Sequence, residues 1–152
     1  MMSMSQPFLA KARKGFFKMK WIILGVFGTY ISSWTSSVLQ NILLPSSVVQ
    51  NNHIYTSVFS IFYAILLAPI IEETLFRNVL IPYLKRKHLR YRYAIMISAG
   101  IFTLIHLDPW FLPYFINGCI YGVIKVKTKD DYSSIICHSV YNLLVLLPIL
   151  IH

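Results

Sequence analysis

Acidic residues are scarce in this sequence, which has five Asp and Glu against fourteen Lys and Arg. Charged residues make up only 12% of the chain, against about 25% in ordinary soluble domains, while 57% are hydrophobic. The two cysteines fall in apolar stretches and lack the spacing of a disulfide framework or a metal site. With a mean hydropathy of +0.62, this composition excludes a typical soluble domain and predicts an integral membrane protein.

The basic residues fall into three short clusters. Five lie within residues 11–20, five within 85–92 and three within 125–129, which leaves only Arg77 outside them. Basic residues confined to short segments beside apolar spans follow the positive-inside pattern of membrane proteins. We therefore attribute the net charge of +9 to membrane topology and contact with anionic lipid, and we expect no nucleic-acid partner.

The apolar stretches between these clusters have the lengths of membrane helices. Residues 1–20 predict a basic amphipathic segment on the cytoplasmic membrane face, and the uncharged residues 45–56 predict an outer loop. The rest, residues 21–152, predicts a single transmembrane domain and an all-α fold, a polytopic membrane helix bundle of about five transmembrane helices with a cytoplasmic N-terminus. The predicted spans are residues 21–44, 57–84, 93–107, 110–126 and 132–152.

Charged side chains interrupt the second span within the stretch PIIEETLFR, which holds Glu72, Glu73 and Arg77. A charge at the bilayer centre costs at least ~2.5 to 3.5 kcal/mol on insertion scales, so this cluster is a candidate functional site. Glu73 and Arg77 are four residues apart, the spacing of a helical ion pair. Glu72 then has no local partner and is a candidate general base. Pro69 predicts a bend ahead of it. A purely structural ion pair with a spare acid at a hydrated seam is the alternative.

Two further helical pairs bring polar groups to membrane depth. Phe102 and His106 end the third predicted span, and His138 and Asn142 lie four residues apart in the last. A rise of about 1.5 Å per residue places Glu72, His106 and Asn142 about 15 to 20 Å from the cytoplasmic loops. The chain can therefore bring these side chains together.

The three pairs resemble the motifs of a known family. EETLFR at residues 72–77, FTLIH at 102–106 and HSVYN at 138–142 match, in order, the EExxxR, FxxxH and HxxxN/D motifs of the CPBP family, also called Abi. This family comprises CAAX prenyl endopeptidases and bacteriocin-processing membrane proteins. The resemblance covers about residues 64–147 and includes all the polar chemistry at membrane depth.

The resemblance implies an intramembrane glutamate-type endopeptidase without metal or other cofactor. In family terms Glu72 and His106 activate the attacking water, and His138 and Asn142 stabilise the oxyanion. The supporting residues are Glu73, Arg77 and Phe102. The implied partner is a hydrophobic or membrane-borne peptide, such as a bacteriocin or pheromone leader or a CAAX-like substrate. The implied location is the cell membrane of a bacterium, with several passes.

The sequence departs from the family at one position and in its length. Members commonly have Gly after the motif arginine, where this chain has Asn78, which can instead hydrogen-bond across helices. Only one predicted span precedes the motifs. Helices that guide the substrate are then either missing or supplied by a second copy, so a homo-oligomer stays open.

Two alternatives differ in chemistry or class. Glu72, His106 and His138 are of types that bind zinc and would leave one position open, although no HExxH motif is present. The second alternative is a non-catalytic membrane immunity protein that binds a bacteriocin or its receptor with the same fold. Chelation tests the first, and substitution of the polar set tests the second.

Overall fold

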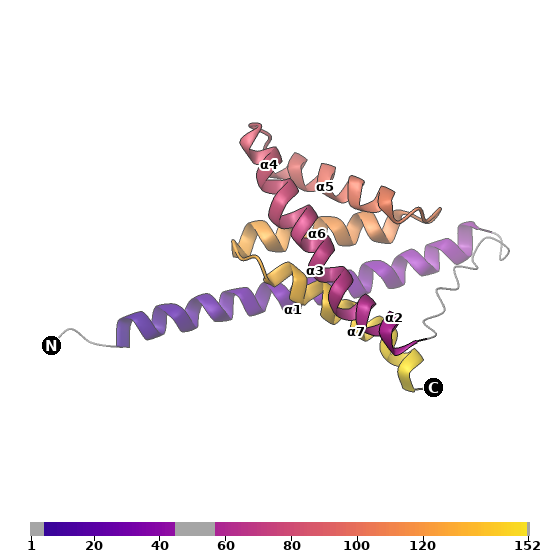
Figure 1. The fold of residues 1–152 in the computed structure, drawn as a ribbon, viewed down its shortest axis with the longest axis horizontal. Coiled ribbons are helices and arrows are strands. Elements are labelled where there is room, and N and C mark those ends of the chain that lie inside the picture. Colours follow the sequence, from indigo (N-terminus) through magenta and orange to yellow (C-terminus); the bar gives the residue numbers. More distant parts are fainter. Residues whose placement is uncertain (1–4, 45–56, 152) are drawn as a thin grey trace.

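The computed structural model describes residues 5–44 and 57–151, and in these ranges the regular structure is helical. Its helices form a bundle, which confirms the predicted all-α fold (Figure 1). The predicted loop at residues 45–56 lies outside the described residues. The first helix is α1 (Ser5–Leu43). The second is one continuous helix made of α2 (Val58–Phe62), η1 (Tyr63–Leu67), α3 (Ala68–Glu73), η2 (Thr74–Leu80) and α4 (Ile81–Arg86). It is followed by α5 (Tyr91–Ile105), α6 (Leu112–Thr128) and α7 (Ser133–Ile151).

Helix α1 differs from the predicted division at residue 21. It runs without interruption from Ser5 through the basic segment into the first apolar stretch, so these two predicted parts lie on one helix. The physical reason is local, because Lys and Arg are good helix formers and no proline or turn signal separates them from Trp21. The contact of this basic segment with the membrane face stays a prediction.

The long helix from Val58 to Arg86 carries the glutamates and is not a regular α-helix. Ser57 caps it through a capping box with Ser60, and two π-helical stretches, η1 and η2, widen the backbone. The chain stays helical through Pro69, and the widening lies ahead of that residue in η1. A bend is predicted at Pro69, and a π-helical turn, a feature common at functional sites, lies directly before this residue.

Helix α6 lies at the centre of the bundle and packs against α1, α5 and α7 (Figure 1). Two glycines allow the close approach to α5 and α4. A Cβ atom on Gly118 would lie 3.1 Å from Cβ of Ala99, and one on Gly122 would lie 2.8 Å from Cγ2 of Ile95. This confirms the packing role predicted for these small residues.

The outer surface of the bundle is strongly apolar. Side chains such as Phe27, Trp34 and Leu104 are exposed by 65% or more. Among the described residues, two helices, Leu9–Leu43 and Val58–Arg86, are long and apolar enough to cross a membrane, and α5 and most of α7 are apolar but shorter. This surface suits lipid contact, and the number of membrane passes stays a prediction.

The connection between α6 and α7 is tied to α1 by charged groups. Lys18 donates to Asp130, whose other carboxylate oxygen accepts a hydrogen bond from Ser133 at 2.8 Å. Burial acts to raise the pKa of Asp130, but the hydrogen bonds from Lys18 and Ser133 outweigh it and hold this pKa below its ordinary value. The ion pair therefore anchors the basic half of α1 on the bundle.

Candidate active site

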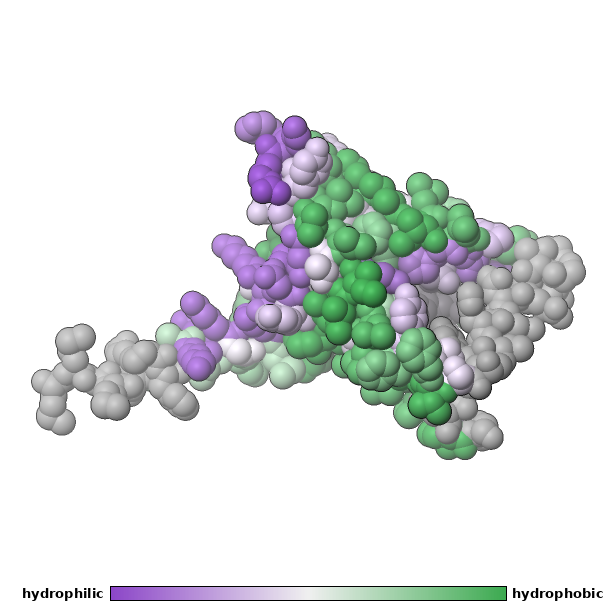
Figure 2. Space-filling view, viewed as in Figure 1, coloured by the Kyte–Doolittle hydropathy of each residue, from purple (hydrophilic) through white to green (hydrophobic). Residues whose placement is uncertain are grey.

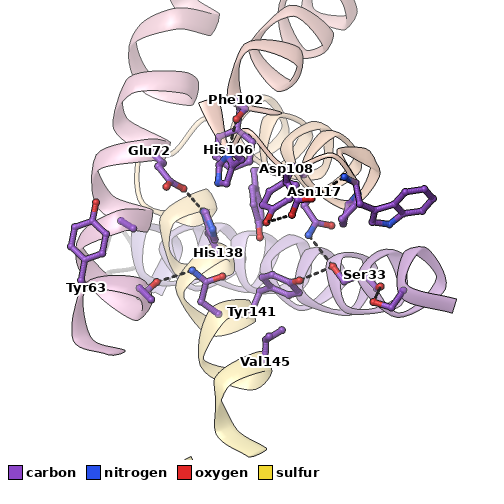
Figure 3. Close-up of a pocket in the computed structure, with 18 of the residues that line it drawn as sticks. Ser33, Tyr63, Glu72, Phe102, His106, Asp108, Asn117, His138, Tyr141 and Val145 are labelled. Carbon is purple, nitrogen blue, oxygen red and sulfur yellow. Dashed lines mark hydrogen bonds and ion pairs between the residues drawn. The ribbon is translucent and has the colours of Figure 1, made fainter. Parts of the chain in front are cut away.

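A cavity of about 670 Å³ lies between α1, the long Val58–Arg86 helix, α6 and α7, with the end of α5 beside it. Its lining includes all four residues predicted as catalytic, Glu72, His106, His138 and Asn142, together with Phe102. In Figure 3 Glu72, His106 and His138 converge from three different helices. Motifs separated by about thirty residues each thus meet in one place, as the sequence predicted.

The two adjacent glutamates occupy different environments. Glu73 is fully buried, with Oε2 3.3 Å from Nε of Arg77, which confirms the predicted ion pair. Glu72 retains 22% of its side-chain exposure and lines the cavity. Its Oε2 lies 3.9 Å from Nδ1 of His138, and His106 lines the same cavity. Of the two acids, Glu72 is the one that a substrate in the cavity can reach.

Arg77 is completely buried behind the cavity. Its Nη2 donates to the backbone oxygen of Gly118 at 3.2 Å, and its guanidinium lies over the ring of Phe102, 4.5 Å from the centroid. A buried charge requires such partners because it has left water. Arg77 therefore joins the glutamate helix to α5 and α6, and Phe102 separates its charge from the cavity.

His138 hydrogen-bonds to the buried Glu73 through its Nδ1 atom. This nitrogen lies 3.2 Å from Oε1 of Glu73 and 3.9 Å from Oε2 of Glu72, and the ring stacks on Tyr121 with centroids 4.6 Å apart. Carboxylate oxygens only accept, so Nδ1 carries the hydrogen. For Nε2 to donate as well, the ring must carry a hydrogen on both nitrogens. The positive charge of that ring would then face the two glutamates.

His106 likewise donates a hydrogen bond from Nδ1, but to a backbone oxygen instead of a carboxylate. Its Nδ1 lies 2.7 Å from the backbone oxygen of Phe102, which can only accept, so Nδ1 donates and Nε2 of the neutral ring keeps its lone pair. The ring packs between Phe102 and Tyr114, with centroids 4.5 and 4.3 Å away. Leu107 then adopts the left-handed backbone conformation (φ 51°) and ends α5. His106 is thereby held as a proton acceptor.

Asn142 of α7 bonds to the backbone carbonyl of Ala64, which has no backbone donor within the glutamate helix. Its Nδ2 donates to the oxygen of Ala64 at 2.7 Å. In η1 the amide of Ala68 bonds to Tyr63, so it does not serve Ala64, and the next residue is Pro69, which has no amide hydrogen. Asn142 therefore replaces a missing backbone donor, and its second amide hydrogen is still available to the cavity.

This geometry yields a prediction on stability. Asn142→Leu leaves the Ala64 oxygen without its donor, so we expect the free energy of unfolding to fall by about 1–3 kcal/mol, measured by thermal unfolding in detergent. Pro69→Ala introduces a backbone amide hydrogen that can bond to the Ala64 oxygen in place of Asn142. In that background the loss caused by Asn142→Leu should shrink; equal losses in both backgrounds would contradict the assignment.

A family model describes part of this chain. The model of type II CAAX prenyl endopeptidases, Rce1-like, matches residues 54–144, which are 91 of the 152 residues. The chain belongs to the Rce1-like family. No curated protein and no solved structure matches it in the same comparisons. Membership confirms the predicted CPBP resemblance and places the chain in a family of membrane-embedded proteases.

The Rce1-like match begins at residue 54 and so leaves out α1, which nonetheless forms one wall of the cavity. Sequence reasoning missed this wall. Ser33 accepts from Nδ2 of Asn117 at 3.1 Å and shares a hydrogen bond of 2.6 Å with the hydroxyl of Tyr141. The signal was present in the spacing of Ser33, Ser37 and Gln40, which puts three polar groups on one helix face.

Asn78, which directly follows the motif arginine of this Rce1-like chain, donates to the backbone oxygen of Asp131 at 3.2 Å. This confirms that it can hydrogen-bond to a neighbouring element. Among residues 5–44 and 57–151, no three His, Cys, Asp or Glu side chains form a group suited to a metal ion.

Proposed function

We propose that this Rce1-like chain is a metal-independent intramembrane endopeptidase in which Glu72 activates water to cleave a hydrophobic, membrane-borne peptide. The supporting observation is the division between the two glutamates. Glu73 is held by Arg77 and His138, whereas Glu72 lines the cavity beside two histidines. One acid is thus committed to the scaffold and the other is available for chemistry.

The geometry supports a defined sequence of proton transfers. A water between Glu72 and His106 gives up a proton to them, with Nε2 of His106 as an acceptor, while its oxygen attacks the peptide carbonyl carbon. The second amide hydrogen of Asn142, and Nε2–H of a fully protonated His138, can donate to the oxyanion. The stored proton then passes to the leaving nitrogen as the carbon–nitrogen bond breaks.

The test is a comparison of peptide termini by mass spectrometry. Membranes from cells that make the wild-type chain should contain new termini that are absent from cells making Glu72→Gln at equal abundance. An unchanged set of termini would contradict the proposal. If Glu72→Gln, His106→Ala and His138→Ala still protected cells against a cognate bacteriocin, the non-catalytic immunity function would replace it.

A further inference from the structure

The three basic clusters lie at one end of the bundle. They occupy the first half of α1, the turn from α4 to α5 and the turn from α6 to α7, and Figure 2 shows hydrophilic residues gathered at this end. Contacts join the first cluster to the third, since Lys18 pairs with Asp130 and Nζ of Lys127 lies 5.6 Å from the ring centroid of Trp21. The basic residues are Lys11, Arg13, Lys14, Lys18, Lys20, Lys85, Arg86, Lys87, Arg90, Arg92, Lys125, Lys127 and Lys129.

The cavity lies toward the opposite end. Its lining takes Gln40 from the last turns of α1, Tyr63 from near the start of the glutamate helix, and Asp108 and Trp110 from the turn between α5 and α6. That turn lies across the bundle from both basic turns (Figure 1). Helix α1, the glutamate helix and the α5–α6 turn thus contribute residues distant from the basic end, and α7 contributes residues 138–145 from its middle.

The position of Glu72 along its helix shows how far the cavity reaches. Glu72 is fourteen residues from Val58 and fourteen from Arg86, about 21 Å from each end at the rise of an α-helix. Between Glu72 and the basic end lie the fully buried Arg77 and Ile81. Toward the other end, the lining of the cavity continues from Glu72 to Gln40 and Asp108, so the space beside Glu72 extends in that direction.

Polar side chains border this space along its length. Ser33, Ser37 and Gln40 face it from α1, and Asn117 and Tyr141 face it from α6 and α7. A polar wall suits water and the backbone groups of an extended peptide, neither of which is stable against lipid chains. At the far end Asp108 accepts hydrogen bonds from the amide of Trp110 and the hydroxyl of Tyr114, at 2.8 and 3.2 Å, which hold the α5–α6 turn beside the cavity.

We propose that the cavity opens on the side of the membrane away from the cytoplasm, and that its substrates are hydrophobic peptides exposed on that side. The orientation follows from the positive-inside rule applied to three clusters that share one end. The statement about substrates rests on the proposed peptidase function, while the orientation does not. The consequence is that prenylated C-termini in the cytoplasm would lie on the wrong side for this site.

The test labels introduced cysteines in intact cells with a membrane-impermeant maleimide. Ser37→Cys places a thiol in the cavity, and we expect it to be labelled from outside, at least several-fold above the wild-type background from Cys119 and Cys137. Thr35→Cys is the matched control, because Thr35 is exposed at similar depth but does not line the cavity. Lys129→Cys, at the basic end, should be labelled only after the cells are permeabilised.

Labelling of Ser37→Cys only after permeabilisation, or not at all, would overturn the proposal, as would labelling of Lys129→Cys in intact cells. Equal labelling of Thr35→Cys and Ser37→Cys would contradict the claim that water fills the cavity beside Ser37. Because these measurements need no substrate, they separate the two proposals. A chain with the expected labelling and no change in peptide termini would contradict the peptidase function alone.

Discussion

Glu72→Gln should lower the rate of peptide cleavage by a factor of about 10²–10⁴, the range that general base catalysis contributes. The amide keeps the size of the side chain but cannot take a proton from water. Glu72 lies at the cavity and is free of the buried ion pair, so the change should leave folding intact. The measurement is the cleavage rate of an identified substrate by purified protein in detergent or lipid.

The control for this prediction makes the same chemical change elsewhere. Asp131→Asn alters a carboxylate that is 69% exposed in the α6–α7 turn and lies at the basic end, so cleavage should be unchanged. His106→Ala tests the partner of Glu72 and should reduce the rate without a large change in unfolding temperature. Full activity of Glu72→Gln would contradict its role as the base.

Arg77→Leu should have the largest effect on stability, a loss of about 3–5 kcal/mol in the free energy of unfolding. The change leaves the carboxylate of Glu73 fully buried without its cation, and removing one member of a buried pair typically has this cost. It also removes the hydrogen bond to the Gly118 oxygen. Thermal unfolding in detergent, or the amount of protein retained in the membrane, provides the measurement.

The matched double variant separates charge from shape. Glu73→Gln combined with Arg77→Leu removes both charges and keeps an oxygen that can accept from His138, so part of the lost stability should return. Arg86→Leu, at an exposed site on the same helix, should change stability little. A double variant less stable than Arg77→Leu alone would show that the ion pair is not the source of the effect.

The sequence could predict which side chains meet at the cavity because residues that are costly in a membrane mark them. Charges are so rare in the apolar stretches that Glu72, Glu73 and Arg77 could be singled out by cost alone, and helical spacing paired Glu73 with Arg77 correctly. Helix boundaries of α5 and α6 were predicted within two residues, since basic clusters and Asp108 with Pro109 delimit them. These features could be predicted because residues close in the sequence determine them.

What the sequence could not supply depends on contacts between distant helices. The π-helical turns have no simple signature, so only the bend at Pro69 was expected. Ser33 belongs to a serine-rich stretch, and which of these serines face Asn117 and Tyr141 depends on the rotation of α1 against α6 and α7. The direction of the His138 hydrogen bond likewise required the position of Glu73.

The two π-helical stretches on either side of α3 have a consequence for the reacting acid. At one end of this short helix the Ala64 oxygen is held by Asn142 of α7, and beyond the other end the Phe76 oxygen accepts from Oγ of Ser98 of α5 at 2.9 Å. Glu72 lies between these two points. The position of Glu72 is therefore a tertiary property, set jointly by two other helices, and a shift of α5 relative to α7 would move the acid with respect to both histidines.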